Sequence, residues 1–177
     1  MSKLHKLGVI GNPIEHSMSP FIHSRFARYE NISLEYLPYK INEPDFNKFV
    51  KEFFSDKNAK GLNVTLPYKK KAAEINGDIS KEAKYINAVN TITNYKNKLS
   101  LASTDGIGFI DDINSKKFDL ENKKILIIGA GAASESVLYK VTKSKVNAIT
   151  IFNRTKEKSE KLQRKYGSFV PISLDVN

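Results

Sequence analysis

The chain has 177 residues, 40% of them hydrophobic, so it can bury one large core or two small ones. It contains no cysteine, which excludes disulfides, thiolate zinc sites and cysteine nucleophiles, and its three histidines show no metal-ligand spacing. No apolar run approaches the ~20 residues needed to span a bilayer, and the first residues lack the apolar stretch of a signal peptide. We therefore expect a cytoplasmic protein without a membrane partner.

The formal net charge is +10, which invites comparison with nucleic-acid-binding proteins. The excess is nearly all lysine spread along the chain, and only four arginines could make bidentate contacts to bases or phosphates: Arg25, Arg28, Arg154 and Arg164. A solvated, lysine-rich surface explains this pattern better, so we expect no nucleic-acid partner. Such a surface would also favour small substrates that carry carboxylates or phosphates.

Strand-like and helical patterns alternate in the first part of the chain. Strand character occurs at residues 7–10, 34–39, 61–65, 89–92 and 99–101. Helical spacing groups two sets of apolar residues, each after a proline: Phe21, Ile22, Phe26 and Tyr29, and Phe46, Phe49, Val50, Phe53 and Phe54. Residues 92–101 predict a hairpin with its turn within 94–98. This alternation favours an α/β layer structure.

A second cycle follows the polar segment 114–117. Residues 123–129 predict a strand that runs into a glycine turn, and a helical pattern, a strand at 148–152, a helix at 155–166 and a weak strand at 169–172 come after it. We therefore expect an α/β protein with an open α/β domain at 1–114, followed at 115–177 by the first half of a Rossmann-type domain. A complete domain of this kind needs two βαβαβ halves.

The segment between strand and helix in this second cycle has the position of a dinucleotide-binding turn. Gly129 permits a tight turn, Gly131 lets backbone amides approach a pyrophosphate, and Ser134 replaces the third glycine of the pattern with another small residue. The turn predicted to bind the cofactor comprises Gly129, Ala130, Gly131, Ala132 and Ala133.

The end of the next strand favours NADP over NAD. No carboxylate stands there for a ribose 2′-hydroxyl, whereas Arg154 offers a cationic fork, Asn153 and Thr155 offer neutral donors, and Lys158 could add a charge. Alternatively, Arg154 is an ordinary surface residue and Thr155 caps the following helix.

Polar side chains also follow the strands of the first domain, where open α/β sheets bind ligands. Ser17 and Ser19 could donate hydrogen bonds to a substrate carboxylate, or one of them could simply cap the helix that begins near Pro20. In the segment 63–69, strand alternation puts Asn63 and Thr65 on the same side of the predicted strand.

Lys69 is predicted to lie in the first turn of a helix started by Pro67. A cation is unfavourable at that end of a helix, and such a conflict can mark function, although Lys69 to Lys71 could equally be a solvated run. Asn90 and Asp105 could bind substrate hydroxyls, or serve as a turn residue and a helix N-cap.

Six segments in this order resemble the shikimate dehydrogenase family: GNPIEHSMSP, NVTLPYK, AVNT, STDG with GIGF, GAGAAS, and NRT. The resemblance covers almost the whole chain, and the shared order of the six segments makes it specific. It implies NADP-dependent interconversion of 3-dehydroshikimate and shikimate in the chorismate route to aromatic amino acids.

The resemblance also assigns roles to individual residues. It places Ser17, Ser19 and Thr65 at the substrate carboxylate, and Lys69, Asn90 and Asp105 at the ring hydroxyls. Lys69 becomes the catalytic acid/base and Asp105 its counter-charge. The turn 129–133 is assigned to the pyrophosphate, and the adenosine 2′-phosphate is assigned to Asn153, Arg154, Thr155 and Lys158.

The chain departs from the family at three points. Ser103 stands where the family usually has asparagine, and Ala132 stands where it usually has glycine. The family's chain also continues into the rest of the nucleotide sheet and a closing helix. We therefore expect a truncated chain, as a monomer or homodimer, with little turnover of its own. The alternative is a non-catalytic fragment that still binds shikimate.

Overall fold

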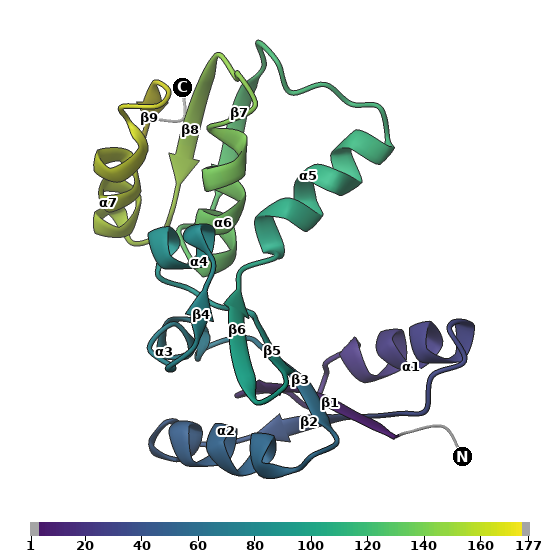
Figure 1. Cartoon of the computed structure of the whole chain (residues 1–177). Helices are drawn as coiled ribbons and strands as arrows, with labels where there is room; N and C mark the ends of the chain where they lie inside the picture. The colour runs from purple at the N-terminus through teal and green to yellow at the C-terminus, as the bar shows by residue number, and fades with distance from the viewer. Residues whose placement is uncertain (1–3, 175–177) are drawn as a thin grey trace. The chain divides into compact units, whose positions relative to one another are not determined.

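The computed structural model describes residues 4–174 and divides the chain into two compact units, Met1–Ser103 and Thr104–Asn177 (Figure 1). Each unit has hydrophobic clusters of its own. No helix in the described range is long and apolar enough to cross a membrane.

The first unit is built on a six-stranded mixed sheet with the strand order β2-β1-β3-β5-β6-β4. Strands β1, β2 and β3 are parallel, β5 is antiparallel to both β3 and β6, and β4 is parallel to β6. The strands are β1 (His5–Gly11), β2 (Leu34–Lys40), β3 (Ala59–Val64), β4 (Asp78–Ile79), β5 (Thr91–Tyr95) and β6 (Lys98–Ala102). The predicted hairpin turns at Lys96 and Asn97, both with positive φ, as a tight hairpin turn requires.

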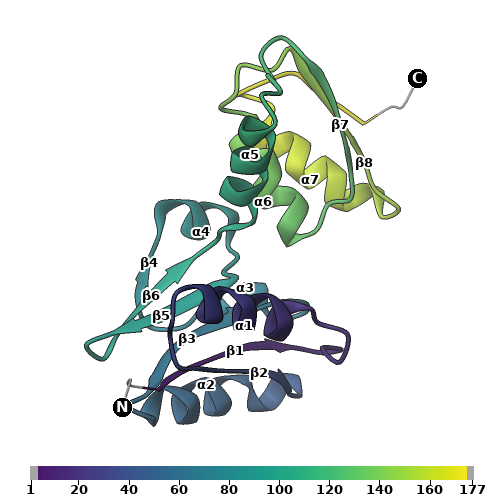
Figure 2. The ribbon, with the colours of Figure 1, turned by 90° about the vertical axis from the view of Figure 1, so that its right-hand side faces the viewer.

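Helices α1 and α2 cover opposite faces of this sheet (Figure 2). The helices of the first unit are α1 (Ser19–Tyr29), η1 (Glu43–Asp45), α2 (Phe46–Ser55), α3 (Lys69–Ala72) and α4 (Lys81–Ile86). As its spacing predicted, α2 buries Phe46, Val50 and Phe53 against the sheet. On α1, in contrast, Phe21, Ile22, Phe26 and Tyr29 are all exposed, and only Ala27 is buried.

The second unit contains a three-stranded sheet in the order β7-β8-β9, with all strands parallel. Its elements are α5 (Asp105–Ser115), β7 (Lys124–Ile128), α6 (Ala132–Val141), β8 (Ala148–Phe152), α7 (Lys156–Tyr166) and β9 (Ile172–Ser173). Leu138, Ile149 and Tyr166 are fully buried in its core. This is the βαβα arrangement expected for the first half of a Rossmann-type fold.

The units divide at Ser103, whereas the sequence placed the boundary after residue 114. The difference arises because α5 packs against α6 rather than onto the first sheet. The backbone N–H of Gly106 donates to the Ser136 hydroxyl at 2.9 Å, and a Cβ on Gly106 would lie 2.2 Å from the Ser136 carbonyl oxygen. Ile110 and Ile113 then pack against the core of the second unit. The absence of a side chain at Gly106 allows this close approach.

Candidate substrate and nucleotide sites

The carboxyl ends of β1 and β3 lie side by side in the first unit. The N–H of Thr65 donates to the carbonyl of Ile10 at 3.0 Å, and the N–H of Asn12 donates to the carbonyl of Leu66 at 3.0 Å. A Cβ on Gly11 would lie 2.6 Å from the methyl carbon of Thr65. Glycine at this position therefore lets the loop after β1 approach Thr65.

Three of the predicted substrate residues line one cavity at this sheet edge. Ser17, Ser19 and Thr65 surround a volume of about 270 Å³, together with Val9, Pro13, Ile14 and His16. The Ser17 hydroxyl also accepts a hydrogen bond from the Ser19 N–H at 3.3 Å. The N-cap of α1 is Met18 and no side chain caps it. Ser17 therefore supports the entry into the helix without being the N-cap residue, and it also lines the cavity.

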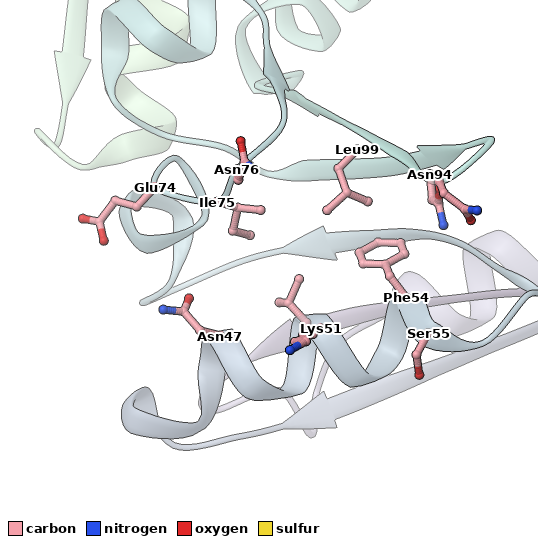
Figure 3. Close-up of a pocket in the computed structure, with 11 residues that line it drawn as sticks. Asn47, Lys51, Phe54, Ser55, Glu74, Ile75, Asn76, Asn94 and Leu99 are labelled. Carbon is pink, nitrogen blue, oxygen red and sulfur yellow. The ribbon is translucent and has the colours of Figure 1, made fainter.

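A larger cavity, of about 650 Å³, lies elsewhere in the first unit (Figure 3). It is formed by α2, the segment after α3 and the β5–β6 hairpin, and its centre is lined by apolar residues such as Phe54, Ile75 and Leu99. None of the predicted substrate residues lines it. Size alone therefore does not identify the substrate site, and the smaller cavity, which Ser17, Ser19 and Thr65 line, is the better candidate.

Lys69 follows β3 and is the first residue of α3. The helix begins there and not at Pro67, because residues 66–68 form a turn closed by a bond of 2.9 Å from the Tyr68 N–H to the Thr65 carbonyl. Lys69 is half-buried, Lys70 is exposed, and the Lys71 ammonium donates to the Glu43 carbonyl at 2.7 Å. The three lysines therefore have different environments, unlike a uniformly solvated run.

Asn90 is held close to both Lys69 and β3 by the backbone. The Val89 N–H donates to the Lys69 carbonyl at 2.8 Å, and the Val64 N–H donates to the Asn90 carbonyl at 2.8 Å. The Asn90 side-chain oxygen accepts from the Thr91 hydroxyl at 2.9 Å. The first unit therefore brings Lys69 and Asn90 to the strand ends where the serines also lie.

Asp105 belongs to the second unit, where it is the first residue of α5. The N-cap of this helix is Thr104, so the alternative interpretation of Asp105 as the N-cap is wrong by one position. The meeting of Asp105 with Lys69 stays a prediction.

In the second unit, the glycine turn lies between β7 and α6, as the sequence predicted. Gly129 has φ of +114°, a conformation that residues with a Cβ rarely adopt. Gly131 is the N-cap of α6, and a Cβ there would meet nothing within 4 Å. Open space at the start of a ten-residue helix suits the approach of an anion.

Asn153 joins the glycine turn to the turn after β8. Its side-chain oxygen accepts from the Ala130 N–H at 3.1 Å, and its amide nitrogen donates to the Thr155 carbonyl at 2.7 Å. This amide therefore orients both predicted cofactor segments, and its own contact with a cofactor stays a prediction. Thr155 is the N-cap of α7 but makes no side-chain capping bond, while Arg154 and Lys158 are exposed.

Two residues near the serines were not singled out from the sequence as part of the site. Tyr36 on β2 donates a hydrogen bond from its hydroxyl to the side-chain oxygen of Asn63 on β3 at 2.8 Å. Strand alternation had placed Asn63 on the same side of the strand as Thr65, and this was the signal in the sequence that could have assigned Asn63 to the site. Nothing local in the sequence marked Tyr36, because its contacts depend on the pairing of β1 with both β2 and β3.

These features define a two-unit α/β protein with a ligand-sized cavity in the first unit and a Rossmann-type half as the second. The model of the shikimate dehydrogenase substrate binding domain matches residues 9–92, and that of shikimate / quinate 5-dehydrogenase matches residues 112–175. The chain belongs to the shikimate dehydrogenase family.

Individual relatives agree with this assignment. The chain is 40% identical over 163 residues to the shikimate dehydrogenase (NADP(+)) of Legionella pneumophila (strain Lens), an alignment that covers 92% of this chain and 61% of that protein. The crystal structure of shikimate dehydrogenase from Aquifex aeolicus matches with a TM-score of 0.88 and 34% identity, over 100% of this chain and 64% of that one.

A third match is shikimate 5-dehydrogenase from Listeria monocytogenes, in complex with shikimate and NAD. Its TM-score is 0.87 at 28% identity, over 98% of this chain and 61% of that one. The chain therefore spans less than two thirds of the length of these relatives.

Proposed function

We propose that the protein containing this chain interconverts 3-dehydroshikimate and shikimate, with NADP as the cofactor. The observation that carries this proposal is the convergence of Ser17, Ser19 and Thr65 on one cavity at the strand ends where Lys69 and Asn90 also lie. Hydroxyl donors suit a carboxylate, and a lysine beside them suits an oxygen on which charge develops. The Legionella relative is named for this activity, and the Listeria relative binds shikimate.

In this proposal, Lys69 is the catalytic acid/base. When bound, NADPH supplies the hydride for the ketone carbon. The Lys69 ammonium donates a proton to the ketone oxygen during reduction, and the neutral amine takes it back from the hydroxyl during oxidation. Asp105 would hold the ammonium in place and orient the hydroxyl that is oxidised. The carboxylate end of the substrate is held by Ser17, Ser19 and Thr65, and Asn90 binds a ring hydroxyl.

The proposed cofactor site has two parts. Residues Gly129 to Ala133 would hold the pyrophosphate at the start of α6. Arg154, Thr155 and Lys158 would bind the 2′-phosphate, with Asn153 at the junction between the two parts. The exposed cations and the lack of a carboxylate after β8 favour NADP over NAD.

The proposal is tested by replacing Lys69 in a steady-state assay of reduced cofactor formed from shikimate and NADP. We expect Lys69→Ala to lower kcat by about 10²–10⁴-fold, the usual contribution of acid–base catalysis, with a much smaller change in the shikimate Kd. Lys70→Ala, which removes an exposed neighbouring ammonium, is the matched control. Comparable losses of turnover and binding in Lys69→Ala would refute a chiefly catalytic role.

The second candidate is non-catalytic binding of shikimate through the first unit, favoured because Ser17, Ser19 and Thr65 all line a cavity within that unit. Calorimetric titration separates the two: heat of shikimate binding without formation of NADPH supports non-catalytic binding. The absence of nucleic-acid partners, the cytoplasmic location and the monomeric or dimeric state stay predictions.

A further inference from the structure

The cavity of about 650 Å³ in the first unit is separate from the one lined by the serines, since the two share no lining residue. Helix α2 forms one of its walls, and the segment after α3 and the β5–β6 hairpin form the others (Figure 3). Its volume falls within the range of about 300–1,000 Å³ that is usual for small-molecule sites. The cavity is therefore large enough for a ligand of its own.

The walls of this cavity are held in place by close packing. A Cβ at Gly77 would lie 2.8 Å from the Leu99 carbonyl oxygen, so the glycine lets the chain after α3 lie against β6. Strand β4 then pairs with β6. On the opposite wall, Val50 and Phe53 of α2 are buried in the core. The cavity is therefore formed by the fold of the first unit itself.

Asn94 occupies a position of β5 that faces the core. In the antiparallel register of the hairpin, Asn94 pairs with Leu99, and Ile92 pairs with Leu101. Alternate residues of a strand share a face, so Asn94 lies on the same face as Ile92, which is fully buried. Asn94 therefore stands where the alternation of the strand calls for an apolar side chain.

The side-chain oxygen of Asn94 is shielded from solvent and has no hydrogen-bond partner within the described residues. An unpaired buried acceptor destabilises a fold, and native structures contain few of them. The amide torsion of asparagine has a broad energy well, so rotation can turn this oxygen towards the cavity without breaking any hydrogen bond that the oxygen makes. A ligand that brings a donor to this end of the cavity would satisfy it.

Apolar side chains line the cavity next to Asn94. The Phe54 ring meets the Phe53 ring edge-on, with centroids 5.2 Å apart and an interplanar angle of 89°, which restricts its orientation. Figure 3 shows Phe54, Ile75 and Leu99 pointing into the space between α2 and the hairpin. Aromatic rings pack well on one another in offset or edge-to-face arrangements. The centre of the cavity therefore suits an aromatic ring.

The charged residues that line the cavity, within the described range, are Lys51 and Glu74. Both are exposed. Lys51 lies three residues before Phe54 on α2, so the two side chains share a face of the helix. The Glu74 side chain points away from the cavity in Figure 3. The Lys51 ammonium therefore favours an anionic group on the ligand, in keeping with the net charge of +10.

We propose that this cavity is a second ligand site, which binds a hydroxyaryl carboxylate. The phenol hydroxyl donates to the Asn94 side-chain oxygen, the ring packs on Phe54, and the carboxylate pairs with the Lys51 ammonium. The site does not depend on the proposed function, because none of the residues assigned to the substrate or the cofactor lines this cavity.

Three probes of similar shape separate these contributions in titrations of the chain followed by two-dimensional NMR. 4-Hydroxyphenylacetate carries both polar groups, phenylacetate lacks the hydroxyl, and 2-(4-hydroxyphenyl)ethanol lacks the carboxylate. We expect 4-hydroxyphenylacetate to bind about tenfold more tightly than phenylacetate, because the hydroxyl satisfies a buried acceptor. It should bind about threefold more tightly than the alcohol, because the ion pair is exposed. The backbone amide signals of Phe54 and Leu99 should shift, and that of Ser17 should not.

Asn94→Leu is the diagnostic variant for the hydroxyl. It should lower the affinity for 4-hydroxyphenylacetate to that for phenylacetate and leave the affinity for phenylacetate unchanged. Because the variant replaces an unpaired oxygen with an apolar group at a core-facing position, its Tm should not fall, so weaker binding would not reflect unfolding. Asn76→Leu, the same change at an exposed residue that also lines the cavity, is the matched control and should keep the tenfold preference.

Lys51→Met is the corresponding variant for the carboxylate. In this variant, 4-hydroxyphenylacetate should bind no more tightly than 2-(4-hydroxyphenyl)ethanol. Lys48→Met removes another exposed ammonium of α2, one that does not line the cavity, and should leave the threefold preference unchanged.

The inference is overturned if the unaltered chain binds 4-hydroxyphenylacetate and phenylacetate equally well, or if Asn76→Leu abolishes the preference as fully as Asn94→Leu. Signals that shift at Ser17 and not at Phe54 and Leu99 would place the probe in the serine cavity and would also overturn it. The absence of any shift with 4-hydroxyphenylacetate would refute the site outright. All of these results leave the proposed function standing, because that function is tested at Lys69.

Discussion

At the scale of single residues, the loop after β1 is fixed by one acidic side chain. The Glu15 carboxylate accepts hydrogen bonds from the Lys40 ammonium on β2 and, at 2.9 Å, from the Ile14 N–H. These contacts hold the segment that carries Ser17. The pKa of Glu15 is lowered from 4.5 to about 2, chiefly by Lys40 and then by backbone N–H groups.

This shift predicts how stability depends on acidity. Because the folded pKa of Glu15 lies below the unfolded one, its contribution is present above pH 4.5 and is lost as the pH falls towards about 2. Glu15→Gln should therefore flatten the slope of unfolding free energy against pH in that window, as measured by urea denaturation. Because the Glu15–Lys40 pair is exposed, Glu15→Gln should change the unfolding free energy at pH 7 only slightly.

Glu52→Gln is the matched control for this prediction. Glu52 is also exposed, and its pairing with Lys48 within α2 is longer, at 3.9 Å. Glu52→Gln should leave the slope of unfolding free energy against pH unchanged. An unaltered slope in Glu15→Gln would show that the Lys40 contact does not persist in solution.

At the scale of elements, the contact between α5 and α6 depends on Gly106 of α5 and not on the second glycine of that helix, Gly108. A Cβ at Gly106 would meet Ser136 backbone atoms, whereas a Cβ at Gly108 would meet nothing within 4 Å. We expect Gly106→Ala to destabilise the second unit by about 1–3 kcal/mol through overpacking. Gly108→Ala should stabilise it by about 0.5–1 kcal/mol, because alanine is the better helix former.

Chemical denaturation, monitored by hydrogen exchange of the amides of the second unit, measures the change in unfolding free energy of each variant. The pair forms its own control, since the two substitutions are chemically identical and lie in the same helix. Equal effects of the same sign would contradict the close approach of α5 to α6.

At the scale of the whole molecule, the second unit leaves apolar surface on one face of its sheet. Ile128 is 75% exposed and pairs with Phe152, which is 51% exposed, and Leu126 on the same face of β7 is 52% exposed. Within the described residues, β7 is an edge strand whose only partner is β8. An apolar face next to an open strand edge promotes association.

We therefore expect the chain to self-associate as its concentration rises, and Ile128→Lys to reduce this association. Light scattering coupled to size-exclusion chromatography measures the mass. Tyr95→Lys adds the same charge at a residue of the first unit that is 72% exposed, and it should have little effect. Equal reductions by both variants would point to net charge and not to the open face.

The local sequence was enough to predict most elements and to single out the two segments that we propose bind ligands. Apolar periodicity predicted α2 and β8. A glycine between a strand and a helix predicted the turn at Gly129, which has positive φ. The position of Ser17 after β1 and of Thr65 after β3 marked these two residues as candidates for the substrate site. These features depend on spacing of two or 3.6 residues and on single-residue conformations, which short stretches of sequence encode.

Tertiary structure decided what depends on contacts between distant segments. The apolar face of α1 was visible in the sequence but its exposure was not, and α5 joined the second unit because Gly106 fits against Ser136. Tyr36 carried no local signal, because its hydrogen bond to Asn63 exists only after β2, β1 and β3 pair side by side. Periodicity reports which face of an element is apolar, whereas only the folded chain determines which partner covers that face.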